Sequence, residues 1–254
     1  MVNEIQLIGI TSVFSGCIIL LLYLRLIQFL KGKFSFSWKD LIVGSLVMIA
    51  SFSVVGVTYI IHQNLRWNPT SIAYLYLFEA LILGIYIEFI RFFFFKFLVK
   101  GYDVEKGYTL GLGFMSPFLM LLIGGGVIGG INIILSPPGV GFSGNVWRDF
   151  IVTPLGLIEQ LILQMFLSIL ILKTLKDFQC KNMIYAIGLH AFTDFVKRYG
   201  MGVIIYDLLP IRLMSPYQDP WFVPGIQTYL AEIVLLSTSV AILYYLVKQV
   251  REIV

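Results

Sequence analysis

The sequence has little charge, and this scarcity excludes a soluble protein. Charged residues make up 13% of the 254 residues and apolar residues 59%, whereas a soluble domain is nearer to about 25% charged and about 45–50% apolar. The mean hydropathy of +0.91 agrees with this imbalance. The composition therefore indicates an integral membrane protein, and we expect a multi-pass protein of the cell membrane that is embedded in the lipid bilayer.

Cysteine and histidine are also scarce, with two of each. Cys17 and Cys180 lie in or beside apolar runs and have no metal or redox spacing, so no disulfide framework is predicted. The net charge of +4 is placed at the ends of apolar runs, which indicates membrane topology rather than nucleic-acid binding. No internal repeat, low-complexity linker or basic signal-type N-terminus is present, so we expect one transmembrane domain over residues 1–254.

Apolar runs long enough to cross a bilayer predict an all-α bundle of about seven transmembrane helices. The expected spans are residues 5–30, 41–62, 72–99, 107–135, 150–174, 182–209 and 222–247. The sixth is interrupted by Lys197, Arg198 and Gly200, so it either continues or stops near Phe195 and resumes. The fourth is rich in glycine, which favours close helix contacts or a break that lines a cavity.

Basic residues predict the orientation of the bundle. They lie at or just beyond the ends of the first, third, fifth and seventh spans, and are Lys31, Lys33, Lys39, Lys96, Lys100, Lys106, Lys173, Lys176, Lys181, Lys248 and Arg251. Short loops rich in lysine and arginine stay on the cytoplasmic side. We therefore expect the N-terminus outside and the C-terminus in the cytoplasm.

Five ionisable residues inside the expected spans are the candidate functional residues: Glu88, Arg91, Glu159, His190 and Asp194. Such side chains cost several kcal/mol at membrane depth and usually face the bundle interior. The helical rise places Glu88 roughly 17 Å and His190 roughly 12 Å from the cytoplasmic ends of their spans, and Glu159 roughly 14 Å from its outer end. We expect these three side chains to meet in one layer.

Spacing within each helix adds two pairs to this layer. Glu88 and Arg91 share a face at i,i+3, as do His190 and Asp194 at i,i+4. A carboxylate beside a histidine sets the tautomer of the ring. The alternative interpretation is that these polar residues only hold helices together. For Glu79 and Glu232, nearer the outer ends of their spans, we expect the side chains to reach water.

Three segments carry a resemblance to a known family. The segment GIYIEFIRFFFFKFL (84–98) resembles the ExxR helix of the YhfC-like intramembrane metallopeptidases, which are grouped with the PrsW, CAAX-prenyl-protease and gamma-secretase Aph-type families. The segments GLIEQLILQMFLSILIL (156–172) and AIGLHAFTDF (186–195) follow at the expected distances. The resemblance covers about residues 70–200, and it implies that Glu88, Arg91, Glu159, His190 and Asp194 are catalytic residues if the chain is active.

The departures from the family pattern concern the metal ligands. Ile87 stands where a second acid is expected, and Phe114 and Gln164 stand where the resemblance implies histidines. A catalytic zinc usually has three protein ligands, mostly histidine with a carboxylate. The ligands left would be His190 with Glu88 and either Glu159 or Asp194, an oxygen-rich set that is poor for zinc but suits a harder metal better. We therefore expect a divalent metal such as zinc only if the chain is active, and otherwise no cofactor.

Four functions remain open from the sequence. The first is a non-catalytic subunit of a membrane complex, a pseudoenzyme with partner membrane proteins. The second is an active intramembrane metalloprotease, with Glu88 or Glu159 as general base and His190 as ligand. The third is a proton-coupled transporter with Glu88, Glu159 and Asp194 along its pathway. A haem-binding subunit is the weakest, because His62 and His190 lie at different depths.

Overall fold

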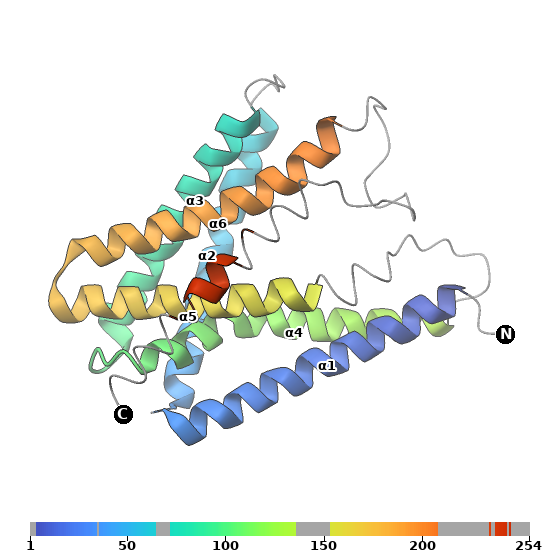
Figure 1. The fold of residues 1–254 in the computed structure, drawn as a ribbon, viewed down its shortest axis with the longest axis horizontal. Coiled ribbons are helices and arrows are strands. Elements are labelled where there is room, and N and C mark those ends of the chain that lie inside the picture. The colour runs from blue at the N-terminus through green and yellow to red at the C-terminus, as the bar shows by residue number, and fades with distance from the viewer. Residues whose placement is uncertain are drawn as a thin grey trace.

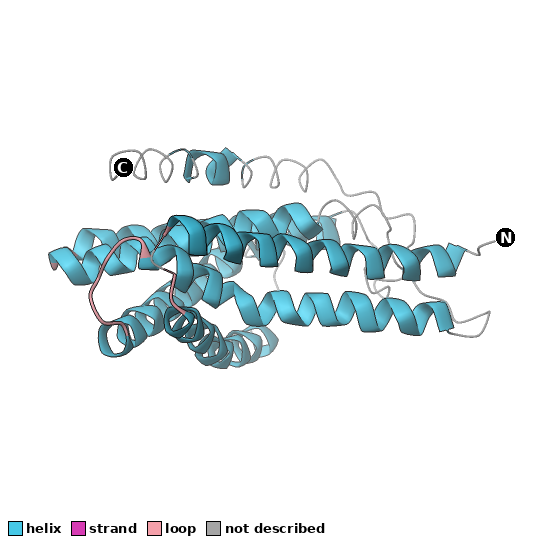
Figure 2. Cartoon of the chain, turned by 90° about the horizontal axis from the view of Figure 1, so that it is seen from below, coloured by secondary structure: helices cyan, strands magenta, loops and turns pink. Residues whose placement is uncertain are grey.

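The computed structural model describes residues 4–34, 36–64, 72–135 and 153–207, together with Val234, residues 237–242 and Tyr244. These residues are almost entirely helical, and no strand occurs among them (Figures 1 and 2). The long helices are α1 (Glu4–Lys33), α2 (Trp38–Asn64), α3 (Ile72–Leu98), α4 (Lys106–Leu135), α5 (Thr153–Asp177) and α6 (Cys180–Asp207). The all-helical fold class is thus confirmed.

The helix boundaries agree with the first six expected spans to within a few residues, because lysines and loop residues flank the apolar runs. The sixth span does not stop near Phe195, since α6 continues from Cys180 to Asp207. The interruption contains no proline, and a glycine inside a helix costs only about 1 kcal/mol. The seventh span expected at 222–247 lies mostly outside the described residues, and so does Glu232.

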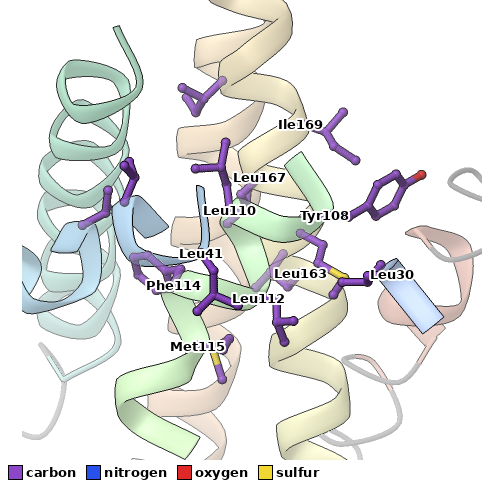
Figure 3. Packing of buried hydrophobic residues seen from close by; sticks show 14 of the residues in the cluster. Leu30, Leu41, Tyr108, Leu110, Leu112, Phe114, Met115, Leu163, Leu167 and Ile169 are labelled. Carbon is purple, nitrogen blue, oxygen red and sulfur yellow. The ribbon is translucent and has the colours of Figure 1, made fainter. Parts of the chain in front are cut away.

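Helix α4 occupies the centre of the packing. It contacts α1, α2 and α5, whereas α3 packs on α2, α5 and α6. Buried side chains of α4 and α5 form much of the core, among them Leu110, Leu112, Leu167 and Ile169, with Leu41 of α2 beside them (Figure 3). The core therefore lies where α4 meets its three neighbours.

Glycines of α4 permit this close packing. A Cβ on Gly113 would clash with the backbone of Leu41, and a Cβ on Gly111 would clash with the backbone of Met165. The first half of the glycine-rich span therefore makes close helix contacts. Pro117 stands inside α4 without ending it, and it leaves the carbonyl of Gly113 without its usual helical donor. The Ser45 hydroxyl donates to that carbonyl at 2.9 Å.

Among the described residues, three helices are long and apolar enough to cross a membrane: residues Gly9–Lys33 in α1, Lys106–Leu135 in α4 and Leu157–Asp177 in α5. These helices run alongside one another in Figure 1, while α2 and α3 cross them steeply. They support a membrane location for the chain. The count of seven spans and the orientation of the termini stay predictions.

Candidate functional site

A close approach of α3 and α6 brings the first two site residues together. A Cβ on Gly84 would lie 3.0 Å from the Ile187 carbonyl oxygen of α6, so the two backbones nearly touch there. One turn further along α3, the fully buried Glu88 faces His190. The Nδ1 atom of His190 lies 2.6 Å from Oε1 of Glu88. A carboxylate only accepts, so the Nδ1–H donates and, in the neutral ring, Nε2 carries the lone pair.

Arg91 holds the other oxygen of the same carboxylate. Its Nη1 atom lies 3.2 Å from Oε2 of Glu88, and neither side chain is exposed. Its Nη2–H donates to Oε1 of Gln164, a buried residue of α5. The guanidinium carbon lies 4.5 Å from the centre of the Phe114 ring of α4, a distance suited to a cation–π contact. Side chains from α3, α4 and α5 therefore fix one buried cation.

We call Glu88, Arg91, Gln164 and His190 the buried polar cluster. It contains one carboxylate, one guanidinium, one amide and one imidazole, and every member is buried. The Glu88 carboxylate accepts from the imidazole and is balanced by the guanidinium. Burial strengthens this attraction, and it also makes the loss of either charge costly.

Glu159 is buried but lies at another place on α5. It lines a small cavity with Gln160, Leu163, Thr193, Thr238, Ser239 and Ile242. The Thr193 hydroxyl donates to the backbone carbonyls of Leu189 and His190, at 3.0 Å each, so its lone pairs remain as acceptors. The expected layer is therefore formed for Glu88 and His190, while Glu159 faces an oxygen-rich cavity between α5, α6 and residues 238–242.

One of the two pairings expected for His190 stays a prediction. Its Nδ1 atom contacts Glu88 of another helix, and Asp194, the expected partner one turn along α6, is partly exposed. One further sequence expectation changes in the structure. Glu79 was expected to reach water, but it is 1% exposed. It lies near the start of α3, where the neighbouring helices already cover it. The side chain of His62 lies outside the described residues.

The residues present do not fit the metal centre that the resemblance implies. In the described part of the chain, no three His, Cys, Asp or Glu side chains come together as metal ligands. Both oxygens of Glu88 already face nitrogen atoms of His190 and Arg91. The guanidinium also places a positive charge next to the carboxylate, which opposes a second cation there. A zinc site made of His190, Glu88 and Glu159 does not fit this arrangement.

Sequence reasoning missed the roles of Phe114 and Gln164. Gln164 accepts from Arg91, and the ring of Phe114 lies against the same guanidinium. The signal was available, because both residues stand at positions where the resemblance implies histidines. These two positions do converge on one point of the bundle, and at that point lies the guanidinium of Arg91.

Comparison with known proteins agrees with the resemblance. Residues 17–136 match the model of the family described as YhfC intramembrane metalloprotease. The matched segment includes Glu88, Arg91 and Phe114 and ends before α5 and α6. No curated protein and no solved structure matches the chain. The family resemblance is confirmed by this match.

Proposed function

On the scaffold of the YhfC intramembrane metalloprotease family, we propose that this chain is a non-catalytic subunit of a membrane complex. In this proposal the bundle is a pseudoenzyme that packs against partner membrane proteins. The observation that carries it is the position of Arg91, which lies between the two residues that replace the implied histidines. The Arg91 guanidinium balances the negative charge of Glu88 at that point, so no metal ion is needed to balance it.

The chemistry of the donor set supports this proposal. A hydrolytic centre needs a metal with an open position for water, held by about three protein ligands. Among the side chains that the structure describes, one histidine is available, and the carboxylate in contact with it is shared with a guanidinium. The cluster is therefore better suited to holding α3, α4, α5 and α6 together than to activating water.

Two other functions remain as alternatives. An active metalloprotease is favoured by the description of the matched family and by the contact of His190 with Glu88, which would orient the ring toward a ligand at Nε2. A proton-coupled transporter is favoured by the buried Glu159 beside its small cavity. Broken helices line the substrate sites of many transporters, whereas α6 is continuous from Cys180 to Asp207.

Metal content is the first test of the proposal. The full chain would be purified in detergent, and elemental analysis would compare the wild type with His190→Ala. We expect less than about 0.1 metal ion per chain in both proteins, because the described residues form no set of three ligands. A near-stoichiometric metal that disappears in His190→Ala would overturn the proposal in favour of the protease.

The assembly role needs a separate measurement. Membranes that contain the chain at its natural level would be solubilised in mild detergent, and the mass of the particle measured. We expect a mass above that of the 28.8 kDa chain plus its detergent, and the same mass for Asp103→Asn, an exposed change in the α3–α4 connection. A monomer in the wild type would contradict a subunit role even if no metal is found.

A further inference from the structure

A groove of about 760 Å³ runs along the surface between α5 and α6, near the turn that joins them. Its volume lies within the range of small-molecule sites, about 300–1,000 Å³. Phe166, Leu170 and Lys173 line it from α5, and Lys181 and Leu189 are among the residues that line it from α6. The groove does not include the buried polar cluster.

The walls of this groove change from charged to apolar along its length. On α5, Phe166, Leu170 and Lys173 follow one another at spacings of four and three, so they share one helix face. On α6 the order is mirrored, with Lys181 near the turn and Leu189 two turns away. Phe166 and Lys173 are seven positions apart, which corresponds to about 10 Å of helix. The groove thus has a basic end and an apolar end.

The basic end also includes the start of α6. Lys181 and Asn182 stand in its first turn and line the groove, where the helix dipole favours an anion. The described residues that line the groove include two lysines and no acid. Next to them, the last turn of α5 carries both Lys176 and Asp177. The net charge at the basic end of the groove is therefore positive, and it complements a phosphate.

An exposed aromatic residue lies at the basic end of the groove, and it indicates that this end is at the membrane surface. Phe178 in the two-residue α5–α6 connection is 90% exposed. Its φ of 54° lies in the left-handed region, which a non-glycine residue adopts at some cost. Phenylalanine is among the apolar residues that interfacial segments bury at the boundary between headgroups and acyl chains. An exposed ring beside the lysines therefore indicates contact with lipid headgroups.

We propose that this groove binds one anionic phospholipid. The phosphate lies between Lys173 and Lys181 at the start of α6, and part of one acyl chain lies along Phe166, Leu170 and Leu189. This position of the lipid explains why the lysines of the groove are confined to one of its two ends. A zwitterionic lipid offers no net charge to the lysines, and a soluble phosphate makes no use of the apolar wall.

The role of the two lysines in lipid binding would be tested on the full chain after its lipids have been removed in detergent. Thermal stability would be measured with phosphatidylglycerol, with phosphatidylcholine of the same acyl chains, and with glycerol phosphate. We expect phosphatidylglycerol alone to raise the Tm, by about 2–4 °C or more. The double variant Lys173→Gln/Lys181→Gln should lose this shift. Lys96→Gln/Lys100→Gln, with the same loss of charge outside the groove, should keep it.

The apolar end would be tested by filling it. Gly188 lines the groove, and a Cβ placed there meets nothing within 4 Å. The variant Gly188→Leu should therefore fold and keep its Tm without lipid, because leucine favours a helix more than glycine does. Native mass spectrometry should show phosphatidylglycerol retained by the wild type and lost from Gly188→Leu.

Several outcomes would overturn the proposal. One is an equal Tm shift by phosphatidylglycerol in both double variants. Another is a Tm shift by phosphatidylcholine that equals the shift by phosphatidylglycerol. Stabilisation by glycerol phosphate alone would mean a soluble anion, and lipid retained by Gly188→Leu would place the acyl chain elsewhere. If Lys173→Gln/Lys181→Gln fails to fold, Lys173→Arg/Lys181→Arg should still bind phosphatidylglycerol. None of these results depends on the metal content or the assembly state.

Discussion

Glu88 is the residue on which the buried polar cluster depends, because its two oxygens join α3 to α6 and balance Arg91. Glu88→Gln should destabilise the fold by about 3–5 kcal/mol, since it leaves a guanidinium buried without a carboxylate. Thermal unfolding in detergent measures the loss. The double variant Glu88→Gln/Arg91→Gln removes both charges and should be more stable than Glu88→Gln alone.

The same pair of variants separates a structural from a catalytic role. A catalytic carboxylate would make Glu88→Gln lose activity while keeping its stability. If Glu88→Gln unfolds at the wild-type temperature, Arg91 is not held by this carboxylate, and the structural role of the cluster is refuted. If the double variant is the less stable of the two, the cost comes from lost packing rather than from an unpaired charge.

Part of this residue-scale picture could be predicted from the sequence. Helical rise gave the depths of Glu88 and His190, and depth was enough to predict their meeting. It could not predict the contacts of Arg91 with Phe114 and Gln164, because these depend on how α4 and α5 rotate about their own axes. Depth also placed Glu159 in the same layer, although its side chain lines a different cavity.

At the scale of the elements, glycine decides how closely α4 approaches its neighbours. Gly111→Ala should be strongly destabilising, because its Cβ would clash with the Met165 backbone of α5 rather than with a movable side chain end. Gly124→Ala is the matched control in the same helix, since its Cβ would meet nothing within 4 Å. That change should be neutral or stabilising by up to about 1 kcal/mol.

The measurement is the Tm of both variants beside the wild type in one detergent. Equal effects of the two substitutions would show that helix propensity, and not the α4–α5 approach, sets the stability. A low Tm for Gly124→Ala would indicate that the outer half of α4 is covered by another helix or partner. The sequence predicted close contacts for this span, but composition alone could not tell Gly111 from Gly124.

The helices themselves were largely predictable because apolar runs end at charged residues. The predicted and observed boundaries of α4 differ by one residue at its start. The uncertain point was the stretch near Lys197, where charge suggested a break but the backbone continues as helix. Hydropathy indicates whether side chains prefer the membrane or water. A helix, however, ends only where its backbone hydrogen bonds end.

For the whole molecule, the orientation in the membrane is the prediction that decides where each surface faces. The charge pattern predicts that the α5–α6 turn and the basic end of the groove lie on the cytoplasmic side. Cys180 stands at this turn and is exposed, so it provides a natural reporter in a Cys17→Ser background. A membrane-impermeant maleimide should label Cys180 in opened membranes and leave it unlabelled in intact cells.

The opposite side supplies the control. Asn145→Cys, introduced together with Cys17→Ser and Cys180→Ser, places one thiol between α4 and α5, and it should be labelled in intact cells. Because α5 is long and apolar enough to cross the bilayer, we expect its two ends to report opposite sides. Labelling of Cys180 but not of Asn145→Cys in intact cells would show that the topology is the reverse of the predicted one. It would also move the lysines of the groove away from the leaflet that is richer in anionic lipid, and the groove would then face the outer leaflet.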